Sequence, residues 1–159
     1  MLYETPFGGV DDAFLAGCRR LREEGFGLVL AHPERAAGFL DGGLERLAGE
    51  LAAGAVVQVS VDSLLGHHGR AALAGAASLL WRGVPAVVAS DGHGGRRTQT
   101  QADGYARLLA AGLSEWRARD LAGGAPRRLL AGGVAAVASR CSPQASSPSS
   151  PKAMAATTA

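Results

Sequence analysis

The hydrophobic and polar positions of the chain alternate between two kinds of segment. Residues 11–24 carry apolar side chains every three or four positions, as one face of a helix does, with acidic residues at the start and a glycine after the end. Residues 26–31 form a short apolar run that a His-Pro pair ends, and this favours a strand. A helix followed by a strand is therefore the first predicted unit.

The same alternation continues along the chain. Helices are predicted where apolar residues recur at helical spacing, and strands where short valine-rich runs occur. The further predicted helices are residues 41–54, 69–83, 100–112 and 113–132, and the further predicted strands are residues 56–61 and 84–90. The opening stretch LYETPF, residues 2–7, is interpreted as the end of another strand. Strands that alternate with helices at this spacing indicate parallel βα units, so the predicted fold class is α/β.

Composition favours one domain followed by a tail. The chain has 159 residues, 47% of them hydrophobic, which is enough for one core. We assign residues 1–141 to the domain and predict that residues 142–159, rich in serine, proline and alanine, are disordered. The net charge is +2 and the arginines are scattered, so a nucleic-acid partner is not expected.

Cysteine usage and hydropathy bear on the cellular location. Cys18 and Cys141 have neither the number nor the spacing of a disulfide framework or a zinc knuckle, which fits a reducing cytoplasm. No run approaches the ~20 apolar residues that span a bilayer, and no basic segment followed by an apolar stretch opens the sequence. We therefore expect a soluble, cytoplasmic protein without membrane insertion.

Acidic and imidazole side chains lie where the predicted strands end. Glu4 lies in the opening strand fragment, His32 follows residues 26–31, and the pair Asp91 and His93 follows residues 84–90. Other polar residues at these ends are Glu34, Asp62 and Ser63. In parallel α/β folds ligands bind outside the carboxyl ends of the strands. We therefore expect these side chains to meet at one edge of the sheet.

These residue types indicate a catalytic metal. Histidine, aspartate and glutamate bind Zn²⁺, Mn²⁺ or Fe²⁺ in hydrolytic sites, and carboxylates can bridge two ions. Alternate residues of an extended strand share a face, so Asp91 and His93 can point toward one ion. Because no cysteine lies near these positions, a structural zinc site is the weaker interpretation.

Each residue also has a plainer interpretation. His32 can be an ordinary loop residue, Asp91 can cap the next helix, and Glu4 can be a solvated end residue. His67 and His68, in LLGHHGR, indicate an exposed turn. What favours a metal site is the recurrence of acid and imidazole at the ends of successive strands.

Four stretches, taken in order, resemble one protein family. LVLAHPER, GAVVQVSVDSLLGHHGRAA, VVASDGHGGRR and GGAPRRLLAGG are similar in order and spacing to the bacterial PHP-type (polymerase and histidinol phosphatase) protein-tyrosine phosphatases of capsule and exopolysaccharide synthesis. LYETPF resembles the strand that carries a ligand glutamate in that family. The resemblance covers about residues 2–133, and its most specific parts are the HPER tetrapeptide and the Ser-Asp-x-His strand end.

The resemblance implies the C-terminal portion of a distorted PHP-type (β/α) barrel with a cluster of divalent metal ions, often Mn²⁺ and alternatively Zn²⁺ or Fe²⁺. Such an enzyme hydrolyses phosphotyrosine on a protein through metal-activated water, and a bacterial tyrosine kinase is one implied partner. The residues that match the family's metal ligands are Glu4, His32, Asp91 and His93. The matching phosphate-binding residues are Arg35 and Arg97, with Arg96 as the alternative to Arg97.

The family pattern also includes ligands that this sequence lacks. A His-x-His strand and a further histidine precede the glutamate strand in the family, and both would lie before Met1. We therefore expect a fragment, one part of a split protein, or a degenerate copy. Besides the protein-tyrosine phosphatase, two functions stay open: a PHP phosphatase of a small phosphate ester of the histidinol-phosphate type, and a catalytically degenerate binding or regulatory protein. The oligomeric state is open.

Overall fold

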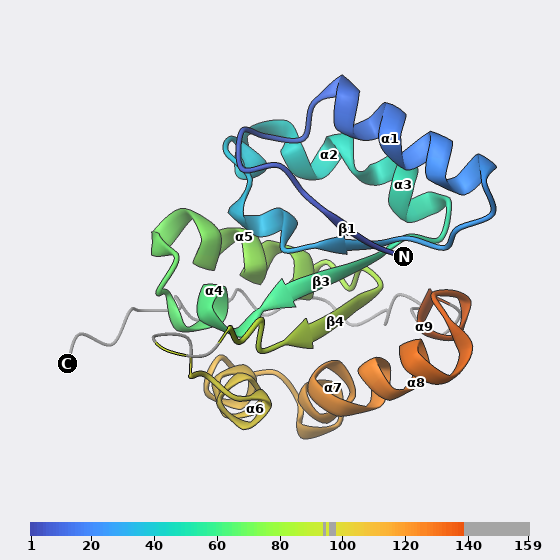
Figure 1. Ribbon diagram of the computed structural model, residues 1–159. Coiled ribbons are helices and arrows are strands. Elements are labelled where there is room, and N and C mark those ends of the chain that lie inside the picture. Colours follow the sequence, from blue (N-terminus) through green and yellow to red (C-terminus); the bar gives the residue numbers. More distant parts are fainter. Residues whose placement is uncertain (94, 96–97, 139–159) are drawn as a thin grey trace.

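The computed structural model of the chain describes residues 1–93, 95 and 98–138. Within them, four short strands form one sheet: β1 (Leu2–Glu4), β2 (Val29–Ala31), β3 (Val56–Ser60) and β4 (Ala86–Ala89). The strands lie side by side in chain order, and every neighbouring pair is parallel (Figure 1). Parallel neighbours need a crossover between them, and helical segments supply each one. The α/β prediction is confirmed, and the arrangement is consistent with part of a β/α barrel.

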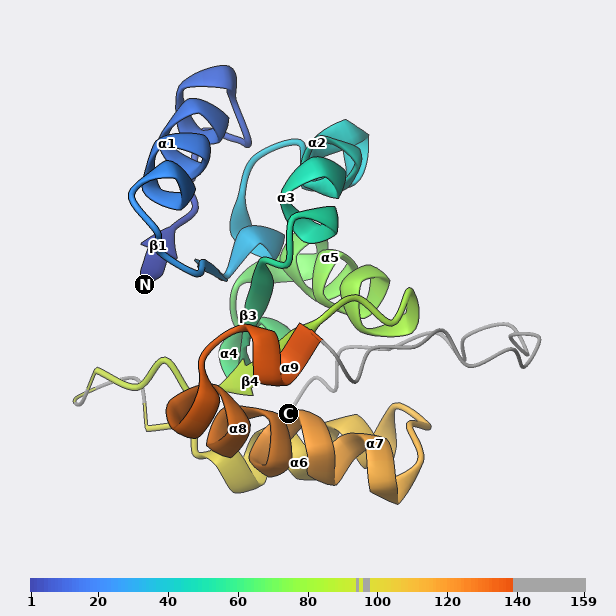
Figure 2. The same cartoon turned by 90° about the vertical axis from the view of Figure 1, so that its right-hand side faces the viewer.

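Helices surround this sheet. The longer ones are α1 (Asp12–Glu23), α5 (Gly69–Trp81), α6 (Gln101–Ala110) and α8 (Ala125–Gly132). The shorter helical segments are η1 (Pro33–Arg35), η2 (Phe39–Gly43), α2 (Leu44–Arg46), α3 (Ala48–Ala52), α4 (Val61–Leu65), α7 (Glu115–Arg119), η3 (Asp120–Gly124) and α9 (Ala135–Ala138). In Figures 1 and 2, α1, α2 and α3 lie toward β1 and β2, whereas α6, α7 and α8 lie toward β4.

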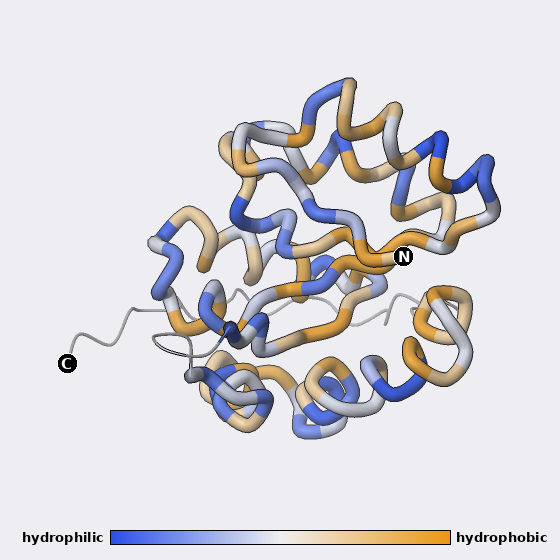
Figure 3. The backbone as a smooth tube through the Cα atoms, viewed as in Figure 1, coloured by the Kyte–Doolittle hydropathy of each residue, from blue (hydrophilic) through white to orange (hydrophobic). Residues whose placement is uncertain are grey.

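The two faces of the sheet are covered differently. Leu30, Val57 and Val88 point into the main core, where they meet buried side chains from α1 to α7, such as Phe14 and Leu79. The opposite face carries a smaller cluster of four residues, Val56, Val87, Ala125 and Val137, in which α8 and α9 take part. Burial on both faces explains why the strand sequences are almost continuously apolar. Figure 3 shows these hydrophobic strands giving way to hydrophilic residues where they end.

The second face also holds a cavity of about 830 Å³. Apolar side chains from β1, β2 and α8 line it, among them Leu2, Val29 and Leu130. The polar side chains of Gln58 and Asp91 reach the same cavity. The smaller apolar cluster therefore leaves part of this face open, next to the edge where the strands end.

One predicted helix is interrupted. In residues 41–54, Asp41 and Gly42 have non-helical backbone angles, with φ of 109° at Gly42, and the segment divides into η2, α2 and α3. Only glycine adopts this positive φ without steric cost, so Gly42 allows the chain to bend there. Residues 113–132, by contrast, are helical as predicted from Glu115 onward, because α7, the π-helical η3 and α8 follow one another without a break.

The strands are shorter than predicted. Residues 26–28 lie outside β2, and Val61, expected at the end of a strand, begins α4 instead. α4 ends at Gly66, which has φ of 85°, as helix C-caps often do. In the part of the chain that the structure covers, no helix has the length and apolar character needed to cross a membrane. The predicted disordered tail, residues 142–159, and Cys141 lie outside the described residues.

Candidate active site

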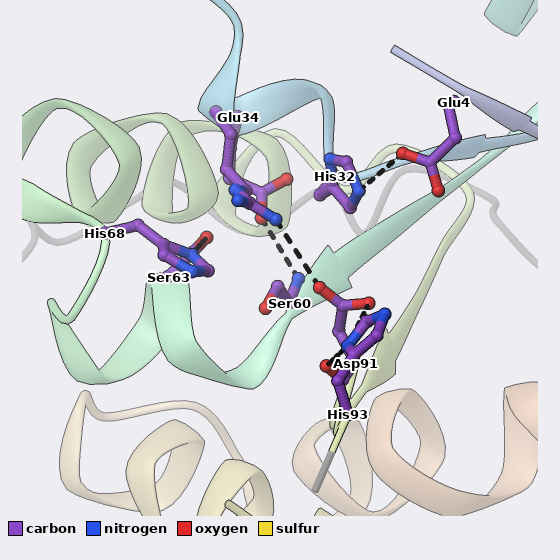
Figure 4. A network of polar contacts seen from close by, with 9 residues as sticks. Glu4, His32, Glu34, Ser60, Ser63, His68, Asp91 and His93 are labelled. Atoms are coloured by element: carbon purple, nitrogen blue, oxygen red, sulfur yellow. Dashed lines mark hydrogen bonds and ion pairs between the residues drawn. The ribbon is translucent and has the colours of Figure 1, made fainter. Parts of the chain in front are cut away.

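The carboxyl ends of all four strands meet at one edge of the sheet. Glu4 is the last residue of β1 and pairs with Ala31 of β2, so that His32 follows directly beside it. Ser60 ends β3, and Asp91 follows β4 by two residues. Figure 4 shows Glu4, His32, Glu34, Ser60, Asp91 and His93 around this edge. The strand-end side chains that the sequence singles out are therefore neighbours in space.

Glu4 and His32 form one pair at this edge. Oε2 of Glu4 lies 2.8 Å from Nε2 of His32. The imidazole is buried, with only 5% of the side chain exposed, whereas 71% of the Glu4 side chain is exposed. The other ring nitrogen, Nδ1, is buried and has no hydrogen-bond partner among the described residues. The packing thus holds the ring with Nε2 directed toward the solvent-facing carboxylate.

Arg35, Asp91 and His93 form a second group. A guanidinium nitrogen of Arg35 lies 3.4 Å from Oδ2 of Asp91. Nδ1 of His93 donates a hydrogen bond of 2.7 Å to the backbone carbonyl of Asp91 and lies 3.8 Å from its Oδ1. Arg35 and Asp91 are mostly buried, with 12% and 18% of their side chains exposed, while His93 is mostly exposed. A cation and a carboxylate from distant parts of the chain therefore meet at the mouth of the site.

The backbone is strained at two of these residues. His32 has φ of 34° and Asp91 has φ of 51°, and within the described ranges no other non-glycine residue has a positive φ. The left-handed conformation costs a residue with a side chain about 1 kcal/mol or more. Such strain persists where the surrounding structure enforces it, and it clusters at functional sites. The strain therefore singles out the same two strand ends as the sequence does.

A family comparison supports this assignment. The family model for capsular polysaccharide synthesis, CpsB/CapC, matches residues 11–131. The chain belongs to the CpsB/CapC family. This is the tyrosine phosphatase family of capsular polysaccharide synthesis, so the resemblance to PHP-type phosphatases is confirmed. The match includes His32, Arg35, Asp91 and His93 and begins after Glu4. Neither the curated proteins nor the solved structures contain a match to the chain.

Two sequence interpretations of this CpsB/CapC site need correction. Asp91 does not cap the next helix, because the side chain of Thr100 is the N-cap of α6. Asp91 and His93 also do not share a face of an extended strand, since β4 ends at Ala89 and the backbone turns left-handed at Asp91. The two residues remain close because the His93 ring turns back onto the Asp91 carbonyl.

The donor types suit a divalent metal, but the donors are divided between two places. Imidazole and carboxylate are ligands of Mn²⁺, Zn²⁺ and Fe²⁺. The structure pairs Glu4 with His32 and Asp91 with His93. Across residues 1–93, 95 and 98–138, no three His, Cys, Asp or Glu side chains lie close enough together to hold an ion. Metal binding by the CpsB/CapC chain therefore stays a prediction from chemistry and resemblance.

Glu34 has a structural role that the sequence did not reveal. Its side chain is buried, and Oε1 accepts a hydrogen bond of 3.0 Å from the backbone N–H of Ser60. Burial raises the pKa of Glu34 to about 7, although hydrogen bonds from Ser60 and Ser63 oppose the rise. This bond ties the HPER segment to the end of β3 and so fixes the position of the neighbouring Arg35. The only feature of the sequence that pointed to a role for Glu34 was its position close to a strand end.

The His-His turn is less ordinary than predicted. Residues 66–68 form a turn, as expected. However, Nδ1 of His67 lies 2.9 Å from Oδ1 of the buried Asp62, and Nδ1 of His68 lies 3.1 Å from Oγ of the buried Ser63. Both imidazoles therefore fix the turn to α4 and do not simply extend into solvent.

One predicted catalytic residue cannot be placed. Arg97, the predicted second phosphate-binding residue, lies outside the described residues, as does its alternative Arg96. Among the described arginines, Arg35 is the one that contacts a predicted site carboxylate. Among the described residues, Arg35 is therefore the candidate for phosphate recognition at this edge.

Proposed function

We propose that the chain is a metal-dependent phosphoesterase that hydrolyses phosphotyrosine on a protein and thereby takes part in regulating capsular polysaccharide synthesis. The observation that supports this most strongly is the meeting of Arg35 with Asp91, both within the CpsB/CapC family match, beside the Glu4–His32 pair. The proposed substrate is a cytoplasmic phosphotyrosyl protein, such as a bacterial tyrosine kinase.

Arg35 is suited to bind the phosphate. A guanidinium group offers planar, paired N–H donors that match phosphate oxygens, and its charge persists at every physiological pH. Its present partner, Asp91, is 3.4 Å away, at the long end of a hydrogen bond. A phosphate dianion competes well for such a loosely held guanidinium. In this proposal Arg35 orients the substrate and balances charge that develops on the phosphoryl group.

The remaining residues are suited to hold metal. Glu4, His32, Asp91 and His93 are the proposed ligands of Mn²⁺, or alternatively of Zn²⁺ or Fe²⁺. When bound, such an ion supplies a Lewis acid for a phosphoryl oxygen and a water of lowered pKa as nucleophile. The protein's part is to hold the His32 ring by burial and to hold the Arg35 segment through the Glu34–Ser60 hydrogen bond.

The test combines metal content with turnover. Purified chain, loaded with Mn²⁺, is compared with His32→Ala and Arg35→Ala for bound metal and for release of phosphate from a phosphotyrosyl peptide. We expect His32→Ala to lose metal and turnover, and Arg35→Ala to keep its metal but to raise KM. Arg20→Ala, on the exposed surface of α1, is the matched control for loss of an arginine. Full turnover by His32→Ala would contradict the assignment of that residue.

A second candidate function is a binding or regulatory protein that retains the fold without catalysis. What favours it is the division of the metal donors into two pairs across the described part of the chain. This candidate predicts that the chain binds a phosphotyrosyl peptide through Arg35 but releases no phosphate at any metal concentration. Stoichiometric metal binding accompanied by turnover would exclude it.

A further inference from the structure

Phe7 is an exposed aromatic residue that touches the candidate site. It is 62% exposed, whereas Phe14 and Phe39 of the core are each 3% exposed. The Phe7 ring lies nearly parallel to the His32 imidazole, at 9° and with 6.0 Å between ring centroids. The guanidinium carbon of Arg35 lies 4.7 Å from the centroid of the same ring. Phe7 thus connects the proposed metal ligand to the proposed phosphate-binding residue.

Phe7 also forms one wall of a pocket. This pocket has a volume of about 450 Å³ and lies between η1, η2 and the beginning of α5. Arg35 belongs both to its lining and to the polar group around Asp91, so the pocket adjoins the place where a phosphate would bind. Leu40, 48% exposed, contributes a second apolar wall. The volume falls within the range of about 300–1,000 Å³ that is usual for small-ligand pockets.

We propose that Phe7 is a specificity-determining residue that selects aryl phosphates over alkyl phosphates. The aromatic ring of a phosphotyrosyl residue packs against Phe7 in this pocket while Arg35 holds the phosphate. The inference rests on the proposed function, because it assigns the part of the site that recognises the group carrying the phosphate.

The chemistry of the contacts favours an aromatic occupant. Isolated exposed apolar residues are common and need no explanation, but Phe7 is in contact with two residues of the candidate site. The Arg35 cation and the His32 ring both pack against the Phe7 ring, which lines the pocket and is 62% exposed. A second ring can pack there in an offset or edge-to-face arrangement. A phosphoseryl side chain has no ring and gains nothing from this surface.

The experiment compares two peptides of the same sequence that differ only in carrying phosphotyrosine or phosphoserine. Dissociation constants are measured by fluorescence anisotropy for the native chain, Phe7→Ala and Phe7→Tyr. We expect Phe7→Ala to weaken phosphotyrosyl binding about fivefold and to leave phosphoseryl binding unchanged. Phe7→Tyr should retain the preference, because it retains the ring. Trp116→Ala is the matched control, since Trp116 is also 62% exposed but lies on α7, away from this pocket.

Three results would overturn the inference. Equal weakening of both peptides by Phe7→Ala would mean that Phe7 only orients Arg35. Unchanged binding would mean that the substrate ring lies elsewhere. Absence of a phosphotyrosine preference in the native chain, including failure to bind either peptide, would remove the basis for a selecting residue.

A parallel measurement separates this inference from the proposed function. Release of phosphate from both peptides is followed with Mn²⁺ present. A Phe7-dependent preference in binding without any turnover would leave aryl recognition standing and contradict the phosphoesterase. Turnover of both peptides at equal rates and with equal affinity would support the phosphoesterase and contradict aryl recognition by Phe7.

Discussion

Glu34→Gln should remove one contribution to the pH dependence of the protein's stability. Burial raises the pKa of the Glu34 carboxyl from 4.5 to about 7, so between these values the folded state binds a proton that the unfolded state releases. The contribution of Glu34 to the stability of the fold therefore falls as pH rises through this window. Below pH 4.5 the carboxyl is neutral in both states and does not destabilise the fold. Above pH 7 it is ionised in both states, and the full destabilisation from the buried charge is present.

The size of the effect follows from the shift. A rise from 4.5 to about 7, at about 1.4 kcal/mol per pKa unit, corresponds to roughly 3 kcal/mol of folding free energy lost across the window. Glutamine removes this loss because it is neutral at every pH, and its amide oxygen can still accept the hydrogen bond from Ser60. The unfolding free energy of Glu34→Gln, relative to that of the native chain, should therefore increase by about 3 kcal/mol on going from pH 4.5 to pH 8.

Urea denaturation followed by circular dichroism, at several pH values between about 4.5 and 8, measures this difference. Titration of all other groups cancels when the variant is subtracted from the native chain. Glu23→Gln is the control, because its carboxyl lies on the exposed side of α1. A difference in unfolding free energy between Glu34→Gln and the native chain that stays constant over the whole range would contradict a raised pKa at Glu34.

Two further predictions concern packing and capping. Thr100→Ala should cost about 1 kcal/mol of unfolding free energy in thermal or urea denaturation, because it removes the N-cap side chain and the capping box of α6. A native stability in this variant would mean that α6 is held by its apolar face alone. Gly75→Ala should cost about 2 kcal/mol, since its Cβ would lie 3.2 Å from both Cβ and the carbonyl oxygen of Glu34. Gly49→Ala in α3, with nothing within 4 Å, is the matched control and should be neutral or stabilising; equal effects in both would contradict the overpacking argument.

Local signals made much of the fold predictable. α1 is found almost as predicted because its apolar spacing, its acidic start and the Asp11 cap, which accepts from the Phe14 backbone N–H, all lie within the segment itself. The prediction of one helix over residues 41–54 was wrong because Gly42 takes a positive φ, which the spacing of apolar residues does not reveal. Likewise, the end of one predicted strand belongs to α4 in the structure. The four buried residues of α4 mix apolar and polar side chains in an order that suits a strand as well as a helix.

The candidate site was predictable only in part. The alternation of strands and helices predicted that the strand ends meet, and this places Glu4 beside His32. The contact between Arg35 and Asp91 joins residues 56 positions apart and depends on side-chain conformations that no local pattern fixes. The burial of Glu34 depends on the packing of η1 against α5, where Gly75 leaves room for it. The side-chain contacts of the site thus come from tertiary packing.

The left-handed backbone at Asp91 implies a conflict between folding and chemistry at that position. Glycine would adopt φ of 51° without steric cost, so an experiment that selects variants for thermal resistance alone should enrich glycine there. The same exchange would delete the carboxylate that Arg35 contacts. A library sorted for stability should therefore enrich glycine at this position, whereas the same library sorted for phosphopeptide recognition should retain aspartate. This difference would identify a functional residue from selection data alone.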